Sequence, residues 1–172
     1  MTYQLHSIEG EEDRQKILEI FQSNPGYFLM FQGRTAQMSD VLSILEERPP
    51  GDPLVDKQFC LIEGQTGQGS RPAAVADWLR DYPEAGIWYV GLFMTAASLH
   101  GTGQSRAIYR WLEEQLRSEG AVRIRLAVLR DNHRALRFWH NAGFRETDRR
   151  THAGEGVTHQ VIVLEKHLMT RD

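Results

Sequence analysis

Residues 87–112 read IWYVGLFMTAASLHGTGQSRAIYRWL, and this stretch contains the strongest structural pattern in the chain. The stretch begins with an apolar run, residues 87–94, that is typical of a buried strand. It ends with apolar residues at helical spacing, with Ile108 and Leu112 on one face. Two glycines, Gly101 and Gly103, lie between these parts. The pattern predicts a strand, a glycine turn and a helix over about 103–118.

A glycine turn before a helix is suited to bind phosphate. Glycine lets the backbone approach a ligand closely, and the first helical turn presents free N–H groups at the positive end of the helix dipole. The turn therefore predicts a seat for a diphosphate, with a plain turn as the alternative. A nucleotide P-loop is disfavoured because Gln104 follows Gly103 where that loop has lysine. A dinucleotide fingerprint lacks its third glycine, since Arg106 stands there, and Ser105 lies too far beyond the strand for a nucleophile elbow.

Periodicity predicts further elements on both sides of this stretch. Strands are expected over 3–8, 58–62, 73–79, 123–128 and 157–164. Helices are expected over 11–22 and 132–142, and around a stripe of Met38, Val41, Leu42 and Leu45. With one further strand, of no assigned bounds, between the last helix and 157–164, the order is β-α-α-β-β-β-α-β-α-β-β, which has too few helices for a fully alternating parallel fold. It favours an α/β fold with a mixed sheet and helices on both faces.

Composition restricts the classes of function. The formal net charge of −3 argues against nucleic acid as the main partner. The single cysteine, Cys60, lies in an apolar run and is expected to be a buried strand residue, which suits a reducing cytoplasm. No apolar run approaches the ~20 residues that span a bilayer, and residues 1–10 lack the apolar core of a signal peptide. We expect a cytoplasmic protein with no membrane partner, and no metal site, because the histidines lack zinc-ligand spacing.

A second stretch, residues 126–144, reads LAVLRDNHRALRFWHNAGF. Together the two stretches resemble the paired motifs of the GNAT acetyltransferases. The first motif, Gln/Arg-x-x-Gly-x-Gly/Ala, corresponds to His100, Gly103 and Ser105, with His100 in place of Gln or Arg and Ser105 in place of Gly or Ala. The second motif, Asn-x-x-Ala followed by Gly-Phe, is matched at Asn132, Ala135 and 143–144. The resemblance covers 87–145. It implies a single domain over residues 1–172 with a mostly antiparallel, twisted sheet.

The resemblance also implies acetyl-coenzyme A as co-substrate, and transfer of its acetyl group directly to an amine. The diphosphate would be bound by His100, Gly101, Thr102, Gly103, Gln104 and Ser105. Phe93 and Thr95 would pair with the pantetheine arm through their main chains, and an N–H near Phe93 or Met94 would polarise the acetyl carbonyl. Asn132, Phe138 and Trp139 would lie along the coenzyme arm. Helix capping by Asn132 and core packing by the aromatic residues, Phe93 included, are the alternatives.

One departure from the motif concerns catalysis. Trp139 stands where many GNAT enzymes carry a tyrosine that protonates the leaving thiolate. Tyr82 and Tyr109 are candidate replacements, and a thiolate with a pKa of ~8.5, judged from cysteine, can leave without much acid help. The departure keeps a second class of function open, a non-catalytic acyl-coenzyme A binding or regulatory domain on the same scaffold.

The acceptor side carries no motif. An alkyl amine with a pKa of ~10.4 is almost wholly protonated at neutral pH, so a base or an equivalent must free it. Asp77 interrupts the apolar run 73–79, and a buried acid must be compensated. We therefore predict Asp77 as base or amine anchor, and interpret Asp81 and Glu84 as loop charges.

The apolar segment 24–31 lies between the first two predicted helices, in the region that shapes the acceptor pocket of the resembling family. Tyr27, Phe28 and Phe31 are predicted to line that pocket, with core packing as the alternative. The acceptor itself is expected to be a small-molecule or peptide amine. A homodimer is the prior expectation for the assembly.

Overall fold

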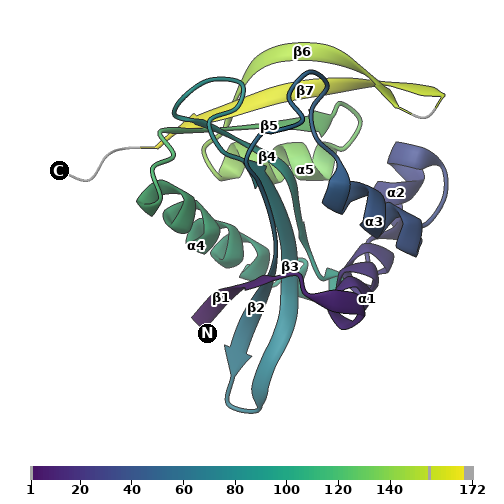
Figure 1. Ribbon diagram of the computed structural model, residues 1–172, viewed down its shortest axis with the longest axis vertical. Helices are drawn as coiled ribbons and strands as arrows, with labels where there is room; N and C mark the ends of the chain where they lie inside the picture. The colour runs from purple at the N-terminus through teal and green to yellow at the C-terminus, as the bar shows by residue number, and fades with distance from the viewer. Residues whose placement is uncertain (1, 155, 169–172) are drawn as a thin grey trace.

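A seven-stranded sheet forms the centre of the computed structural model, which describes residues 2–154 and 156–168 (Figure 1). Its strand order is β1-β2-β3-β4-β5-β7-β6. The strands are β1 (Thr2–Ser7), β2 (Lys57–Thr66), β3 (Gly69–Leu79), β4 (Ile87–Thr95), β5 (Arg123–Leu129), β6 (Arg145–Gly154) and β7 (Val157–His167). Neighbours are antiparallel, except that β4 and β5 run parallel. The predicted mixed, mostly antiparallel sheet is therefore confirmed.

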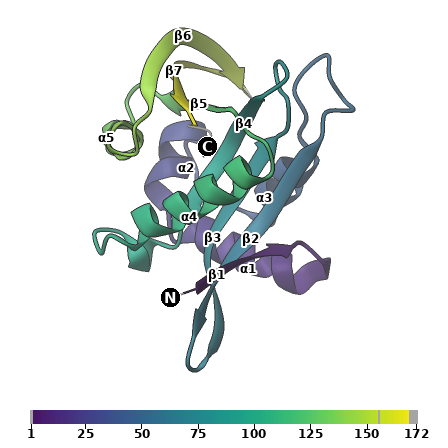
Figure 2. The same ribbon diagram turned by 90° about the vertical axis from the view of Figure 1, so that its left-hand side faces the viewer.

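Helices cover both faces of the sheet (Figures 1 and 2). One face carries α1 (Gly10–Gln22), α2 (Pro25–Gln32) and α3 (Met38–Glu46), and the other carries α4 (Gln104–Ser118) and α5 (His133–Asn141). A 3-10 turn, η1 (Ala97–Leu99), joins β4 to the loop before α4. The sequence predicted no helix at α2, because Pro25 and Gly26 resemble a break. Proline is in fact well tolerated in the first turn of a helix, where its missing N–H costs nothing.

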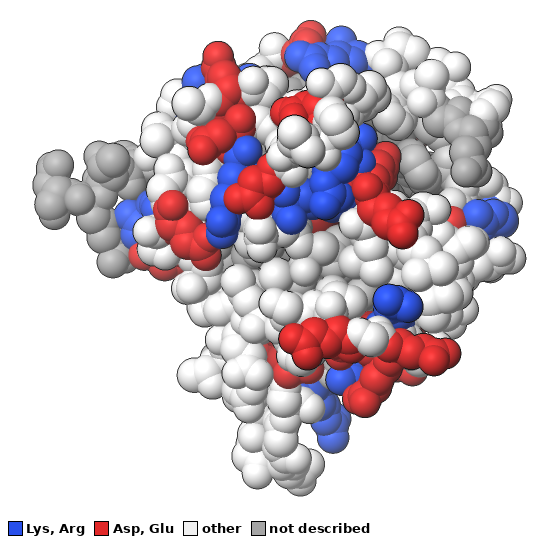
Figure 3. Space-filling model, in the orientation of Figure 1, with Lys and Arg blue, Asp and Glu red and all other residues white. Residues whose placement is uncertain are grey.

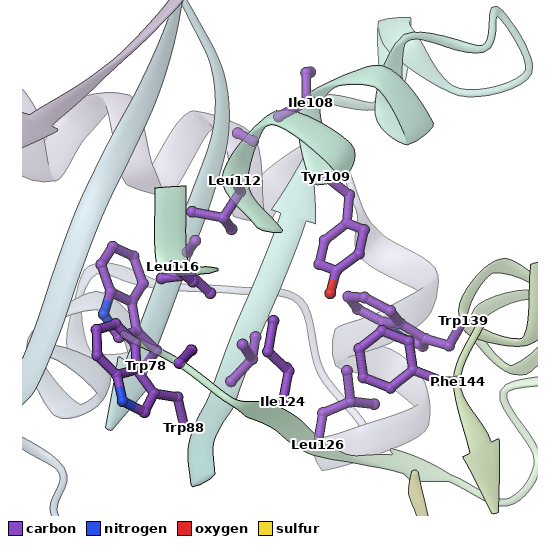
Figure 4. Packing of buried hydrophobic residues seen from close by; sticks show 14 of the residues in the cluster. Trp78, Trp88, Ile108, Tyr109, Leu112, Leu116, Ile124, Leu126, Trp139 and Phe144 are labelled. Carbon is purple, nitrogen blue, oxygen red and sulfur yellow. The ribbon is translucent and has the colours of Figure 1, made fainter. Parts of the chain in front are cut away.

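Each face of the sheet has its own core. One cluster packs α4 and α5 on the sheet and includes Trp78, Trp88 and Leu112 (Figure 4). The other packs α1, α2 and α3 on the opposite face. The predicted stripe of α3 is confirmed for Val41, which is fully buried, but not for Leu42, which is 42% exposed. The two residues are adjacent, and therefore lie about 100° apart around the helix.

Cys60 lies in the core as predicted, and burial raises the pKa of its thiol to about 11. The face of the molecule shown in Figure 3 carries charges of both signs. Arg123 pairs with Glu84 at 3.3 Å and with Glu165 at 3.5 Å. None of the helices in the described ranges is long and apolar enough to cross a membrane.

Candidate active site

The parallel strands β4 and β5 separate soon after they meet. They pair only over Ile87–Tyr89 and Arg123–Arg125. Beyond that point β5 pairs with β7, and within the described residues β4 pairs only with β3. A bulge lies at the point of separation: Leu92 is opposite Asp77 and Val90 is opposite Trp78, so Gly91 has no partner in the ladder. Because a bulge bends its strand, β4 turns away from β5 and leaves one edge open.

A cavity of about 550 Å³ fills this opening and extends toward α2 and α3. Its lining includes residues predicted to contact the coenzyme, residues predicted to contact the acceptor, and several residues that the sequence did not indicate. The predicted lining residues are Tyr27, Phe31, Asp77, Tyr82, Phe93, Met94, Asn132 and Trp139, and the others include Glu47, Arg48, Lys57, Tyr89, Gly91, Arg150 and His152.

The two edges of β4 differ in what they bind. The N–H of Ala96 donates to the Ala73 carbonyl of β3 at 2.9 Å. Main-chain groups alternate between the two edges along an antiparallel strand. Those of Met94 therefore face β3, and those of Phe93 and Thr95 face the open edge. Of the two predicted polarising amides, Phe93 is the one directed at the cavity.

The loop before α4 has the conformation that its glycines permit. Gly101 and Gly103 have φ angles of 76° and 83°, in the left-handed region that favours glycine. Two of the predicted amides are used inside the loop, since Thr102 N–H donates to the Leu99 carbonyl at 3.4 Å and Gln104 N–H to the Thr102 hydroxyl at 3.3 Å. Amides with no hydrogen-bond partner among the described residues remain at Gly101, Gly103 and Ser105.

Side chains tie this loop to the strand and to α1. The hydroxyls of Thr95 and Ser105 lie 2.8 Å apart, which joins the end of β4 to the first turn of α4. The Asn24 side chain donates to the Thr95 carbonyl at 3.0 Å, and Ala97 N–H donates to the Ser23 hydroxyl at 3.1 Å. The free amides of the loop are therefore held in place before any ligand arrives.

Two further polar residues predicted at the coenzyme have partners in the protein. Burial lowers the pKa of His100, the nearby charge of Arg134 lowers it further, and a hydrogen bond to the Thr95 carbonyl opposes both. Asn132 caps α5, since its side-chain oxygen accepts from Ala135 N–H at 3.1 Å. It also lines the cavity, so capping and coenzyme contact are compatible.

An aromatic cluster supports the cavity from the side of α4 and α5. Trp139 is 7% exposed and packs edge-to-face on Tyr109, with ring centroids 4.7 Å apart (Figure 4). Phe93 stacks on Phe138 at 6.0 Å. Phe93 and Trp139 thus both pack in the core and line the cavity, whereas Tyr109 is buried behind them and does not line it. Burial raises the pKa of Tyr109 well above its ordinary value, and Tyr82 is the better placed of the two tyrosines proposed as acids.

Asp77 is buried at the bend of β4, with an exposed fraction of 4%. Burial raises the pKa of its carboxyl to about 6, and the nearby charge of Lys57 opposes that rise. The Lys57 ammonium lies 3.3 Å from the carboxylate. A carboxyl that changes protonation near neutral pH, inside a cavity, has the property a general base needs.

Of the three aromatic residues predicted to line an acceptor pocket, two line the cavity and one does not. Tyr27 and Phe31 line the cavity with their rings stacked 6.0 Å apart. Burial raises the pKa of Tyr27 to about 12, with smaller contributions from the charges of Asp77 and Glu47. Phe28 points elsewhere: it is 5% exposed and packs in the core of that face. Its core-packing alternative is therefore the one the structure favours.

Sequence reasoning missed Lys57, Gly91 and Asn24. A glycine inside an apolar strand is a known sign of a bulge, so Gly91 could have been noticed. Asn24 belongs to the segment 24–31, which the sequence relates to the acceptor pocket and not to the glycine turn. Lys57 follows a proline-rich loop and has no pattern that distinguishes it from a surface lysine.

Comparison with known proteins identifies the family and supports the fold. The model of the Acetyltransferase (GNAT) family matches residues 15–144. Among solved structures, an acetyltransferase from Thermus thermophilus is 23% identical, with a TM-score of 0.72 and 98% of each chain covered. The ribosomal-protein-S18-alanine N-acetyltransferase from Escherichia coli is 15% identical, with a TM-score of 0.66 over 99% of this chain and 97% of that one.

The microcin C7 self-immunity acetyltransferase MccE, in complex with acetyl-CoA and AMP, is 17% identical, with a TM-score of 0.67 over 96% of this chain and 92% of that one. At these identities the likeness shows the fold alone. No curated protein sequence matches the chain. The family match spans most of the chain, including both motifs and the split between β4 and β5, and the protein belongs to the GNAT acetyltransferase family.

Proposed function

We propose that this protein is an N-acetyltransferase that moves an acetyl group from acetyl-coenzyme A directly to a primary amine. The observation that carries the proposal is the single cavity that contains both the open edge of β4 at Phe93 and the buried carboxyl of Asp77. Direct transfer needs a donor and an acceptor site that share one space. The complex of MccE with acetyl-CoA supports a coenzyme site of this kind in the fold.

The residues of the coenzyme side fit acetyl-coenzyme A, which supplies an activated acetyl thioester. The free amides of Gly101, Gly103 and Ser105 would bind the diphosphate at the positive end of α4. The main chain of Phe93 would pair with the amide-bearing arm at the open edge. Its N–H would then be directed at the acetyl oxygen, where negative charge develops during transfer.

Asp77 would take the proton that the acceptor ammonium must lose. The amine nitrogen then forms a bond to the thioester carbonyl carbon, and the carbon–sulfur bond breaks. The nitrogen releases its second proton as the amide forms, and this proton is passed to the departing thiolate. The thiolate leaves with the bonding electrons, and a thiol of pKa ~8.5, judged from cysteine, needs little acid assistance. Trp139 in place of tyrosine is compatible with this route. Tyr82 is the cavity residue best placed to return a proton.

The acceptor would be a small-molecule amine or the amine of a peptide. The E. coli neighbour is named for acetylating an alanine of a ribosomal protein, which makes a peptide N-terminus one member of the panel to test. Release of free thiol from acetyl-coenzyme A should be followed with a polyamine, free amino acids, a peptide N-terminus and a lysine peptide. Acetylated products should be confirmed by mass spectrometry.

Asp77→Asn should lower kcat about 100-fold with little change in acetyl-coenzyme A affinity, because general base catalysis typically contributes 10²–10⁴-fold. Glu84→Gln, in an exposed loop, is the matched control and should retain the parent rate. Tight acetyl-coenzyme A binding with no acetylated product from any amine would instead support a non-catalytic acyl-coenzyme A binding domain.

A further inference from the structure

Lys57 is a buried lysine with three partners. Its side chain is 6% exposed, and its ammonium nitrogen lies 3.3 Å from a carboxylate oxygen of Asp77. The same nitrogen donates to the main-chain carbonyls of Ile44 at 2.6 Å and Glu47 at 3.0 Å. An ammonium group has three protons to donate. Each of the three ammonium protons of Lys57 therefore has an acceptor, and the three contacts together fix the position of the nitrogen.

The carbonyl partners of Lys57 belong to the C-terminal end of α3. The last carbonyls of a helix have no partner within the helix, and they form the negative end of its dipole. Lys57 satisfies two of them, while Arg48 donates to the carbonyls of Leu45 and Glu46 at 3.4 and 3.3 Å. The lysine therefore connects α3, which forms the acceptor side of the cavity, to Asp77 on the central sheet.

The carboxylate of Asp77 is restricted on its other side by the bulge of β4. A Cβ atom at Gly91 would lie only 2.4 Å from the Oδ1 atom of Asp77. The N–H of Leu92 also donates to the Asp77 carboxylate. The carboxylate thus sits between the Lys57 ammonium and the bent backbone of β4. Losing Lys57 would remove the only cationic partner that the described residues offer it.

We propose that Lys57 is a positioning residue, whose ammonium group holds the Asp77 carboxylate ionised and directed at the bend of β4. The inference rests on the proposed function, in which Asp77 accepts the proton of the acceptor amine. The other groups that interact electrostatically with Asp77 are Glu47 after α3, Tyr27 on α2 and Tyr89 on β4, and none of these three carries a positive charge. Arg48, Arg150 and His152 line the same cavity, but among the described residues Lys57 is the cation that pairs with the Asp77 carboxylate. Lys57 is therefore the residue that favours the ionised form through its charge.

The kinetic test compares Lys57→Met and Lys57→Arg over a range of pH. Without the cation, Asp77 binds its proton more tightly, so the acid limb of kcat/KM should move to higher pH by about one unit or more. At pH 6 the ionised fraction of Asp77 then falls from about one half to about one eleventh, so a further loss of about fivefold or more is expected, beyond any loss at the alkaline plateau. Lys57→Arg should move the limb back toward the parent position. Lys16→Met, which removes a lysine of α1 paired with Glu12, is the control and should match the parent.

A lysine with a purely structural role would give a different profile. Lys57→Met would then lose activity by the same factor at every pH, with no movement of the acid limb. That result overturns the proposal.

A second measurement does not depend on the folding of Lys57→Met or on activity. The chain has three lysines, Lys16, Lys57 and Lys166, so ¹³C-labelled lysine gives three side-chain signals that Lys16→Met and Lys166→Met assign. The Lys57 signal of the parent should show a step near pH 6, where Asp77 titrates, and Asp77→Asn should remove it. A Lys57 signal with no such step overturns the proposal.

The two hypotheses fail in different ways. If no amine is acetylated, the proposed function fails, but the lysine signal still shows whether Lys57 and Asp77 are coupled. If Asp77→Asn lowers turnover while Lys57→Met keeps the parent acid limb, the proposed function stands and the inference on Lys57 is overturned.

Discussion

Gly91→Ala tests the geometry of the bend in β4 with a single methyl group. The added Cβ would lie 2.4 Å from the Asp77 Oδ1 atom, about 1 Å inside ordinary contact at 3.4 Å. The carboxylate cannot simply rotate away, because Lys57 holds it at 3.3 Å and Leu92 N–H donates to it. It must therefore move by about 1 Å, and a 1 Å misplacement can cost about 100-fold in rate. The forced contact should also lower the free energy of unfolding by about 1–3 kcal/mol.

The assay is thiol release with the best acceptor amine, together with calorimetric affinity for acetyl-coenzyme A and a urea unfolding curve. Gly67→Ala is the matched control, since it adds the same methyl at a hairpin turn with nothing within 4 Å. A double variant provides the sharpest test: if the methyl acts through Asp77, adding Gly91→Ala to Asp77→Asn should cost little further rate. A Gly91→Ala enzyme with parent kcat/KM, or additive losses in the double variant, would refute the reasoning.

Three further predictions concern the proposed base Asp77, the glycine turn at Gly103 and the buried Trp139. The parent kcat/KM should rise with pH to a plateau with a midpoint near pH 6, because burial raises the pKa of Asp77 to about 6 and only its ionised form accepts a proton; a profile that is flat between pH 5 and 7 would contradict this. Gly103→Val should weaken acetyl-coenzyme A binding at least tenfold, measured by calorimetry. The control, Gly10→Val, places valine at a similar positive φ at the start of α1, so it should lower the stability of the fold but not its affinity for acetyl-coenzyme A. Trp139→Phe should lower the free energy of unfolding by about 1–3 kcal/mol in a urea titration yet keep kcat within a few-fold, since no acid function is lost with the indole.

The sequence predicted the part of the fold in which local pattern and function coincide. The apolar run of β4, the glycine turn and the start of α4 follow one another in the order that residues 87–112 suggest. Asn132 could be recognised as a helix cap because capping depends on neighbours in the chain. Asp77 was noticeable because an acid inside an apolar run requires a special environment.

The remaining site residues depend on contacts between distant segments. Lys57 reaches Asp77 across 20 positions of the chain, and no local pattern shows that contact. Phe28 and Phe31 lie in the same apolar segment, and only the rotation of α2 decides that Phe28 enters the core and Phe31 the cavity. The helix α2 itself was missed because Pro25 and Gly26 are common both at helix starts and in turns.

The contacts of Ser23 and Asn24 have a consequence for engineering this enzyme. These two residues follow the first helix, yet they hydrogen-bond to Thr95 and Ala97, at the junction between β4 and the glycine turn that we propose as the diphosphate site. Exchanging the amino-terminal helices for those of a relative, in order to alter the proposed acceptor pocket, would also remove the hydrogen bonds that hold the proposed coenzyme site in place. A chimera should therefore keep both side chains, or its coenzyme affinity should fall together with its selectivity.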